Sequence, residues 1–497
     1  MDIVLLQNQK DHVDRLSSIL NENNFAFDLS MMGSGKTYTS THIAHLRNLS
    51  IVVVCPASVI PKWKMMQRKN PDITFHLITS FQTLRSTKLH QPSHGLLYRR
   101  EMENSNLAEF QPTPKLLQFV EDGVLLIIDE LQNIKNVSIQ LFAVQALTRL
   151  IVSAPKTSKS KVLLLSASPI DKASQAVEIF RGLGVLLRPL TQYNPAYASN
   201  VWTGLRDVHE FCLKIDDAST RNVPPKYYWE TTFDNFVYRL FQHVLVQKCS
   251  SQMVEKKFCA KLTKANAYYT IDKEGEEIMK RGMQVLTTAT LYHDGSVQWD
   301  AQRISSITRA LQVIETGKLN MFVRIARHYL ETTSGKLVLA MNYSESLNDL
   351  RRDLAEFSPL SLEGSSSVTQ RESVLQKFSE PSLAHRLLVC NQSVASTGID
   401  LDDKDGRFPR LCLVSPNYSS ITAFQLGHRF LRMDTQSDSI VHFVYAKRAN
   451  TPISECKDII ELRVLDALGR KSSIMRETLG MEVEVQFPGE HEEFIEA

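Results

Sequence analysis

A glycine-containing turn stands between a short apolar segment and a helical segment near the start of the chain. The apolar segment Phe25–Leu29 is predicted to be a strand, the turn is SMMGSGKT at Ser30–Thr37, and YTSTHIAHL follows as a helix. Glycines let backbone N–H groups approach an anion closely, and the start of a helix adds a favourable dipole. Strand, turn, Lys-Thr and helix in this order predict a phosphate-binding loop.

The positions of this turn have distinct expected roles. Gly33, Ser34 and Gly35 are the candidates for a backbone cradle around a nucleotide. Lys36 would reach the β- and γ-phosphates, and the Thr37 hydroxyl would ligate Mg²⁺. ATP and Mg²⁺ are the cofactors that these residues predict.

Ser30 departs from the strict phosphate-loop pattern, which has glycine at this place. Taken alone, the motif could also be a glycine-rich turn before an ordinary helix. The strand before it and the helix after it favour phosphate binding.

Two adjacent carboxylates end a second apolar strand in GVLLIIDELQNIKN, residues 123–136. Asp129 is expected at the carboxyl end of this strand, where α/β sheets place their ligands. It would hold Mg²⁺, directly or through water, and Glu130 would polarise the attacking water as general base. Adjacent acids also occur at plain strand ends, but this pair follows a phosphate loop with a further strand between them.

These residues need a sheet to position them, and residues 1–186 predict one. Short apolar strands alternate with helix-length segments such as 138–152, whose apolar residues recur at intervals of three and four. That alternation predicts a parallel sheet covered on both faces. The strand candidates are Phe25–Leu29, Ile51–Cys55, Phe75–Ile78, Val124–Ile128 and Val162–Leu165.

The rest of the chain predicts a second lobe of similar build. Residues 187–335 have few β-branched runs and are expected to be a mainly helical linker or insertion. Alternation returns over 336–450, and 451–497 is expected to be a C-terminal helix and tail. The predicted strands of this lobe are 336–341, 386–390, 410–415 and 439–446, and its helices are 344–357 and 370–378. The predicted fold class is therefore α/β, with two parallel-sheet lobes.

Composition excludes several classes of protein. The 497 residues carry a net charge of only +3, so a basic surface for nucleic acid would have to be local. The seven cysteines form no C-x-x-C pair, which argues against a disulfide scaffold and a structural zinc site. The N-terminus lacks the features of a signal peptide, and no run approaches the ~18 apolar residues that span a bilayer. We expect a soluble, intracellular protein.

In their order along the first 185 residues, these motifs resemble the core of superfamily two helicase-type ATPases, and most of all the Swi/Snf-related branch. Such cores have two RecA-like lobes, and they tolerate the serine at position 30. The resemblance marks Gln9 as the glutamine that reads adenine and Gln132 as a catalytic residue. The segments that carry it are LLQNQKDHVDRL (5–16), SMMGSGKT (30–37), CPASVIPKW (55–63), ITSFQTL (78–84), DELQNIKN (129–136) and LSASP (165–169).

Residues 335–450 continue the resemblance. QLGHRFLRMD (425–434) keeps the spacing Gln-x-x-x-Arg-x-x-Arg, so Gln425 becomes a catalytic candidate and Arg429 and Arg432 become candidate arginine fingers. Phosphoryl transfer needs positive charge on its transition state, which gives the two arginines a chemical reason of their own. By itself, however, the segment could equally be an amphipathic helix with a solvated basic face. The other matching segments are KLVLAMNYSESLNDL, SSSVTQRESVLQKFSEP and ASTGIDL, the last with Ser396 in place of the family's glycine.

Two further groups of residues are implied by position in this core. Residues expected to couple hydrolysis to movement are Ser166, Ala167, Ser168, Gly398 and Asp400. Small hydroxyls and amides at strand ends bind a phosphate backbone without reading its sequence. The candidates for this nucleic-acid contact are Ser58, Lys62, Thr79, Ser80, Lys135, Asn136 and Thr397.

Three other patterns have competing interpretations. The basic run 247–264, with five lysines and one glutamate, could contact nucleic acid or could be a solvated face. The aromatic residues of 226–241 could stack on bases, but at helical spacing they favour a core. The pairs His90/His94 and His42/His45 have no third ligand nearby and favour ordinary surface or packed histidines over a metal site.

Three functions remain open from the sequence. The resemblance favours an ATP-dependent translocase on double-stranded DNA. A strand-separating helicase on DNA or RNA is the first alternative, although PTRELA and DEAD strings are absent from the chain. A degenerate scaffold that binds nucleic acid without turnover is the second alternative, which Ser30 and Ser396 keep open.

Overall fold

A six-stranded, fully parallel sheet organises the first half of the chain, with the strand order β10-β1-β7-β6-β2-β3. Its strands are β1 (Phe25–Asp28), β2 (Ser50–Cys55), β3 (Phe75–Ser80), β6 (Val124–Asp129), β7 (Lys161–Leu165) and β10 (Ser250–Ser251). In this computed structural model, the described residues are 4–86, 95–101, 108–194, 199–223, 233–253, 258–291, 301–432, 434–452, 455–456, 458–459, 461–479 and 492–493.

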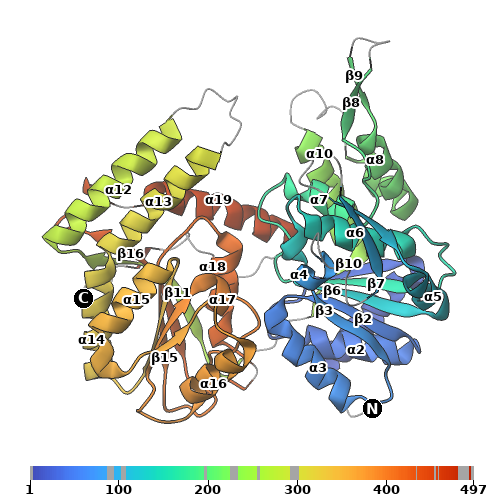
Figure 1. The fold of residues 1–497 in the computed structure, drawn as a ribbon. Coiled ribbons are helices and arrows are strands. Elements are labelled where there is room, and N and C mark those ends of the chain that lie inside the picture. The colour runs from blue at the N-terminus through green and yellow to red at the C-terminus, as the bar shows by residue number, and fades with distance from the viewer. Residues whose placement is uncertain are drawn as a thin grey trace. The chain divides into compact units, whose positions relative to one another are not determined.

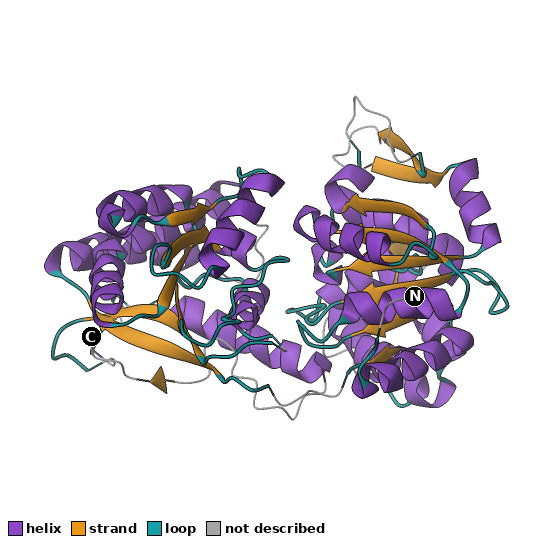
Figure 2. Ribbon diagram, turned by 90° about the horizontal axis from the view of Figure 1, so that it is seen from below, coloured by secondary structure: helices purple, strands orange, loops and turns teal. Residues whose placement is uncertain are grey.

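Alternate residues of each strand enter different cores, because successive side chains of a strand point to opposite faces. Ile128 and Leu126 of β6 face one apolar cluster, whereas Ile127 and Leu125 face another. Helices cover both faces of the sheet, as Figure 2 shows for the sheet that carries the N label. A sheet buried on both faces explains why its strands are almost continuously apolar.

The helices of this first lobe are mostly short. They are α1 (Gln7–Glu22), α2 (Lys36–Leu46), α3 (Ile60–Lys69), α4 (Phe81–Leu84), α5 (Pro114–Asp122), α6 (Ile139–Val152), α7 (Gln175–Gly182), α8 (Gly204–Ile215), α9 (Asp217–Arg221), α10 (Phe233–Leu240) and α11 (Gln247–Cys249), with the 3-10 turns η1 (Ala57–Val59) and η2 (Leu131–Ile134) and the π-helical turn η5 (Phe241–Val246). Two antiparallel strand pairs add to them (Figure 1), namely β4 (Leu97–Glu101) with β5 (Ala108–Pro112) and β8 (Thr191–Asn194) with β9 (Ser199–Trp202).

A seven-stranded parallel sheet organises the second lobe, in the order β13-β14-β12-β15-β16-β11-β17. Its strands are β11 (Leu262–Thr270), β12 (Lys336–Met341), β13 (Leu360–Leu362), β14 (Leu387–Asn391), β15 (Arg410–Val414), β16 (Ser439–Lys447) and β17 (Glu492–Glu493). Its helices are α12 (Lys273–Leu291), α13 (Ala301–Gly317), α14 (Leu319–Thr332), α15 (Ser344–Asp353), α16 (Val368–Ser379), α17 (Gln392–Ala395) and α18 (Ser420–Gly427), with the 3-10 turns η6 (Ala355–Phe357) and η7 (His428–Phe430).

The predicted α/β class with two parallel-sheet lobes is confirmed, and the predicted strands lie within a residue or two of their expected bounds. Two compact units emerge from the chain. Lobe 1 comprises Met1–Lys256 with Ile474–Met481, and lobe 2 comprises Lys257–Ser473 with Glu482–Ala497. The C-terminal helix α19 (Leu462–Leu479) therefore has residues in both units.

Residues 187–335 do not form one mainly helical unit. Their first part clusters with lobe 1 and their last part with lobe 2. β11 pairs with β16 over nine residues, so a strand of the lobe 2 sheet lies inside the segment expected to be helical. Its sequence LTKANAYYT contains small and polar residues rather than a β-branched run, which hid the strand.

Among the described residues, no helix is both long enough and apolar enough to cross a lipid bilayer.

Truncating a side chain at the centre of the first sheet tests the two-faced core. Ile127 is fully buried on β6, so Ile127→Ala should lower the free energy of unfolding by about 3 kcal/mol through lost burial and a cavity. Leu46→Ala, at an exposed position in the same lobe, should change it by less than about 0.5 kcal/mol. Urea unfolding followed by circular dichroism measures both, and equal losses would contradict this description of the core.

Candidate nucleotide-binding site

The ends of three neighbouring strands bring the predicted chemistry of lobe 1 together. In the parallel register, Asp28 of β1 and Asp129 of β6 both pair with Leu165 of β7, which lies between them. The segments that follow these strands therefore start at the same edge of the sheet. They are the glycine-containing turn, the Glu130 segment and the turn that begins with Ser166.

The glycines of the turn are required by its backbone. Gly33 and Gly35 have φ angles of 80° and 101°, which non-glycine residues rarely adopt. Gly35 caps α2, and a Cβ atom there would lie 2.4 Å from Nε2 of Gln9. The turn is therefore followed directly by the first backbone N–H groups of α2, and this arrangement binds phosphate in other proteins.

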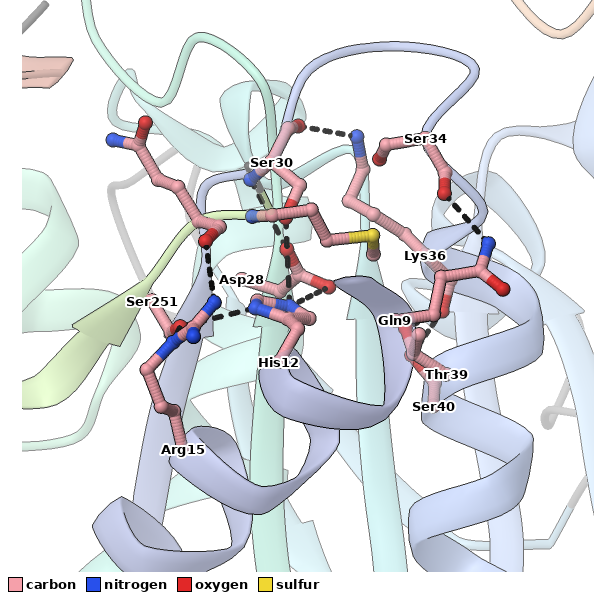
Figure 3. Close-up of polar contacts among 12 residues, drawn as sticks. Gln9, His12, Arg15, Asp28, Ser30, Ser34, Lys36, Thr39, Ser40 and Ser251 are labelled. Atoms are coloured by element: carbon pink, nitrogen blue, oxygen red, sulfur yellow. Dashed lines mark hydrogen bonds and ion pairs between the residues drawn. The ribbon is translucent and has the colours of Figure 1, made fainter. Parts of the chain in front are cut away.

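Side chains already engage the carbonyl groups of this turn (Figure 3). The Lys36 ammonium donates hydrogen bonds to the carbonyl oxygens of Ser30, at 2.7 Å, and Met31, at 3.1 Å. Gln9 donates from Nε2 to the carbonyl oxygen of Ser34 at 2.9 Å. Thr37 is buried at the start of α2. Gln9 thus lies against the loop, and its role in reading adenine stays a prediction.

Asp129 is buried beside this loop and is held by an indole. Nε1 of Trp63 donates to its Oδ2 at 2.8 Å. Burial, and secondly the charge of Glu130, raise the pKa of Asp129 to about 6, against the opposing effects of Trp63, Lys36 and Lys62. A buried carboxylate next to a second one favours a cation, which suits the expected role in holding Mg²⁺.

A chain of side-chain hydrogen bonds runs from Glu130 to the end of β7. Gln132 donates from Nε2 to Oε2 of Glu130 at 2.7 Å, and the Ser166 hydroxyl donates to Oε1 of Gln132 at 2.7 Å. The Ser166 oxygen in turn accepts the N–H of Ser168 at 3.1 Å. Glu130 itself has a φ of 62°, an uncommon backbone conformation for a non-glycine residue. The candidate base is thus connected to the segment expected to couple hydrolysis to movement, in which Ala167 is also buried.

The lobe 1 candidates for nucleic-acid contact fall into two groups. Lys62 is exposed, and Ser58 is half-buried near the start of α3. Thr79 and Ser80 are buried, and the Ser80 hydroxyl accepts the N–H of Thr83 as the cap of α4. The hydroxyl of Ser80 therefore has a structural role as a helix cap.

Lys135 and Asn136 follow the acidic strand end. The Lys135 ammonium pairs with Oδ1 of Asp171 at 2.8 Å, and its side chain is 15% exposed. Burial lowers the pKa of Lys135 below its ordinary value, although Asp171 acts in the opposite direction. Asn136 is exposed, and its Oδ1 accepts from Nε2 of Gln175 at 3.5 Å.

In lobe 2, both candidate arginine fingers are held by the segment after β14. Arg429 is 5% exposed and donates from Nε at 3.0 Å, and from a second guanidinium nitrogen, to the carbonyl oxygen of Ser396. Arg432 is 9% exposed and pairs with Oδ1 of Asp400 at 2.7 Å. Gly398, with a φ of 68°, forms the turn between these two partners.

This burial excludes the alternative of a solvated basic face for QLGHRFLR. α18 ends at Gly427, and the two arginines follow in η7 and the turn after it. Gln425 is also buried, and Thr397 is half-buried. The structure therefore brings Arg429 and Arg432 together with the segment Ser396–Asp400.

The basic run 247–264 is not a uniform basic face. Lys248 pairs with Asp216 at 2.9 Å, and Lys264 is buried, with its Nζ 2.8 Å from Nε2 of His428. Of the other three lysines, Lys261 is exposed, and residues 256 and 257 lie outside the described residues. Direct nucleic-acid contact by Lys264 is therefore excluded in this conformation.

Aromatic residues of the segment 226–241 belong to the core where they are described. Phe236, Tyr238 and Phe241 are buried, which confirms the core interpretation for these positions. Residues 226–232, His90 and His94 lie outside the described residues. The rings of His42 and His45 lie 6.5 Å apart on α2.

Several residues of this site have no role assigned from the sequence. Burial and a hydrogen bond define Trp63 as the partner of Asp129, and its place in CPASVIPKW was the only signal. His12 and Asp28 are both buried below the loop, with Nε2 of His12 3.1 Å from Oδ2 of Asp28. Their sequence separation left no local pattern.

A known viral protein is similar to this chain in sequence. No family model matches the chain. A protein of Acanthamoeba polyphaga mimivirus, described as a putative ATP-dependent RNA helicase, is 22% identical over 439 residues, which cover 84% of this chain and 75% of that protein.

Two solved structures are similar at lower identity. The Sulfolobus solfataricus SWI2/SNF2 ATPase core in complex with dsDNA is 14% identical, covers 97% of this chain and 98% of its own, and has a TM-score of 0.32. The C-terminal part of the Fun30 ATPase domain is 11% identical, covers 45% of this chain and all of its own, and has a TM-score of 0.29.

The chain is thus similar over most of its length to a protein described as a putative ATP-dependent helicase, and its two parallel-sheet lobes agree with the fold that the resemblance to helicase-type ATPases predicts.

Breaking the connection between Glu130 and the end of β7 should slow hydrolysis. Ser166→Ala removes the donor to Gln132, and we expect kcat for ATP to fall about tenfold with little change in KM. Gln132→Ala should have a similar effect, and the double variant should be no worse, because both remove one connection.

Steady-state ATPase kinetics measure these three variants. Ser50→Ala is the matched control, since the Ser50 hydroxyl donates to the carbonyl oxygen of Gly123 at the opposite edge of the same sheet. Additive losses for Ser166→Ala and Gln132→Ala would contradict a shared role.

Proposed function

We propose that this chain is an ATP-driven motor that translocates on double-stranded DNA. The observation that carries the proposal is the hydrogen-bonded chain from Glu130 through Gln132 to Ser166. It connects Glu130, the candidate general base, to the end of the neighbouring strand β7. A movement of the Glu130 side chain can therefore be transmitted to the segment Ser166–Ser168. Such a connection is what a device that turns hydrolysis into movement requires.

For the chemical step, each residue of lobe 1 has a task that its position supports. The loop from Gly33 to Thr37 binds the triphosphate through backbone N–H groups, and Lys36 neutralises the β- and γ-phosphates. Glu130 orients and deprotonates the attacking water. These tasks use the loop, the strand end and the helix start that share one edge of the sheet.

Mg²⁺ fits the oxygen donors available beside the loop. Thr37 contributes a hydroxyl and Asp129 a carboxylate whose raised pKa reflects a buried negative charge with too little compensation. Oxygen ligands of this kind suit a hard divalent cation. When bound, the ion would neutralise charge on the phosphates, while Thr37 and Asp129 hold it in place.

Arg429 and Arg432 are proposed to complete the site from lobe 2. Positive charge from a second lobe stabilises the transition state only when the lobes close on the nucleotide. Because both arginines contact the Ser396–Asp400 segment, such a closure would also move Thr397 and Gly398. Those residues are the lobe 2 candidates for contact with a nucleic-acid backbone and for coupling.

A second function has an observation of its own in its favour. The viral relative is described as an RNA helicase, so strand separation on RNA or DNA is the alternative to translocation on duplex DNA. A scaffold without turnover is the third possibility, and it has no support from the arrangement of Lys36, Asp129 and Glu130.

Nucleic-acid stimulation of ATP hydrolysis separates these functions. We expect duplex DNA to stimulate the ATPase of the full chain more than single-stranded DNA or RNA, and we expect no displacement of a labelled strand. Lys36→Ala should abolish turnover, and Glu130→Gln should reduce it at least about a hundredfold while keeping ATP binding.

The other outcomes assign the alternatives. Stimulation by RNA with strand displacement would establish the helicase. A wild-type protein that binds nucleic acid without hydrolysing ATP would establish the scaffold, and either result would overturn the translocase.

An exposed lysine tests the nucleic-acid track directly. Lys62→Ala, near the start of α3, should weaken duplex binding at all sequences and lower the slope of log Kd against log salt by about 1. Lys69→Ala, at the other end of the same helix and also exposed, is the matched control and should leave the slope unchanged. Fluorescence anisotropy over a range of salt concentrations measures both, and equal slopes for the two variants would remove Lys62 from the track.

A further inference from the structure

A fully buried group of polar side chains lies directly below the phosphate-binding loop, and the chemistry proposed for the site does not use it. His12 on α1, Asp28 at the end of β1 and Ser30 at the first position of the loop are each 0% exposed. Figure 3 shows them between the loop and α1, with Gln9 and Arg15 on the same helix. Burying polar and charged groups costs free energy unless they are hydrogen-bonded. The question is therefore which hydrogen bonds these buried side chains make.

Each member of the group is bonded to the next. Nε2 of His12 lies 3.1 Å from Oδ2 of Asp28, and the other carboxylate oxygen, Oδ1, accepts the N–H of Ser30 at 3.0 Å. The Ser30 oxygen accepts the N–H of Met253 at 2.9 Å and lies 3.4 Å from Nε2 of His12. The loop therefore begins from a residue that is fixed through both its main chain and its hydroxyl.

The remaining bonds of His12 lead to β10. Its Nδ1 lies 3.0 Å from the Ser251 hydroxyl oxygen, which also accepts from Nε of Arg15 at 3.1 Å. With a proton on Nε2, His12 faces Oδ2 of Asp28 and the Ser30 oxygen, and its Nδ1 can accept from the Ser251 hydroxyl. Burial would raise the pKa of Asp28, but His12, Lys36 and the bond to Ser30 together outweigh burial and lower the pKa below its ordinary value. Asp28 is therefore the charged acceptor to which the loop's first N–H is bonded.

This bonding accounts for the serine that departs from the strict loop pattern. Ser30 is not among the residues with positive φ, so its backbone has no need of glycine. A glycine would lack the oxygen that accepts the N–H of Met253, and that buried N–H would lose its partner. The carbonyl group of the same residue accepts from the Lys36 ammonium. Ser30 thus connects the phosphate-binding lysine to the buried group below it.

We propose that His12, Asp28 and Ser30 are positioning residues that hold the phosphate-binding loop in its nucleotide-binding conformation by fixing its first residue to the segment Ser251–Met253. The inference rests on the proposed function, in which this loop binds the triphosphate of ATP. A loop that is already ordered loses less conformational entropy when its ligand binds. Loss of the anchor should therefore weaken nucleotide binding even though none of the three side chains touches the nucleotide.

Removing a single oxygen atom tests the proposal. Ser30→Ala in the full chain should raise the Kd for ATP about tenfold, the effect of one buried hydrogen bond to an ordered loop. Ser30→Thr keeps the oxygen and should restore the wild-type Kd. Asp28→Asn should weaken ATP binding as well, and the double variant Ser30→Ala/Asp28→Asn should be no weaker than the stronger single loss, because the residues act as one unit.

Ser160→Ala is the matched control for burial and stability. Ser160 is also 0% exposed, and its oxygen accepts a backbone N–H, that of Val124 at 2.9 Å, where β6 begins at the opposite edge of the sheet. It should lower the melting temperature about as much as Ser30→Ala and leave the Kd for ATP unchanged. Isothermal titration calorimetry with ATP and thermal unfolding give the two readouts for every variant.

Lys36→Ala separates failure of this inference from failure of the proposed function. If Lys36→Ala binds ATP like the wild type, the loop is not the nucleotide site and both proposals fail. If Lys36→Ala loses binding while Ser30→Ala keeps the wild-type Kd, only the positioning role is overturned. Should Asp28→Asn not be recovered as folded protein, Ser30→Ala with Ser30→Thr still decides the question, because the serine variants add no charge or bulk beyond one methyl group.

Discussion

The parallel alignment of β1, β7 and β6 is the constraint on which the lobe 1 site depends. A side chain can act on a phosphate only from a few ångströms away, yet the loop and the acidic pair are separated by about ninety residues of chain. Parallel pairing solves this problem because every strand delivers its carboxyl end to the same edge. The register that puts Asp28 and Asp129 opposite the same residue of β7 then leaves Ser166 between them. The parallel sheet itself therefore places the loop, the acidic pair and the coupling segment next to one another.

Burial on both faces is what keeps that alignment. The strands are almost entirely apolar, and a slip of one residue would exchange the side chains of the two cores. Where the strands of lobe 1 end, polar side chains bond to one another, as Gln132 does with Glu130 and Ser166. The two lobes use this principle differently: lobe 1 fixes a loop over a strand end, and lobe 2 fixes two guanidinium groups against the turn after β14.

Much of this architecture follows from local pattern, and the rest depends on contacts between distant residues. β12 matches its predicted bounds of 336–341 because a fully buried parallel strand is a continuous apolar run with turn residues on either side. β11 escaped prediction because polar residues of this strand are buried: Lys264 lies against His428, and Asn266 is buried as well. No periodicity announces such a strand.

The candidate site divides in the same way. Residues in the loop and the acidic pair were predictable, since their types and spacing are set by the chemistry of phosphate and Mg²⁺. Trp63, His12 and Ser251 were not, because each acts through a partner that lies far away in the chain. Hydroxyls expected at a nucleic-acid surface, such as that of Ser80, instead cap a helix, a role that depends on where the next helix starts.

The contacts of Arg429 and Arg432 with their own lobe set a condition on any nucleotide that recruits them. Both guanidinium groups have carbonyl or carboxylate partners within lobe 2, so a phosphate group gains them only by exchange. Replacing a protein acceptor by a phosphate oxygen changes the free energy of binding only slightly. This gain in binding free energy increases with the charge of the phosphate group. The terminal phosphate of a triphosphate can therefore replace the lobe 2 acceptors of these arginines, whereas a nucleotide with fewer phosphates cannot. If the two arginines act as proposed, this competition would let lobe 2 distinguish a nucleoside triphosphate from a diphosphate by the charge of the terminal phosphate.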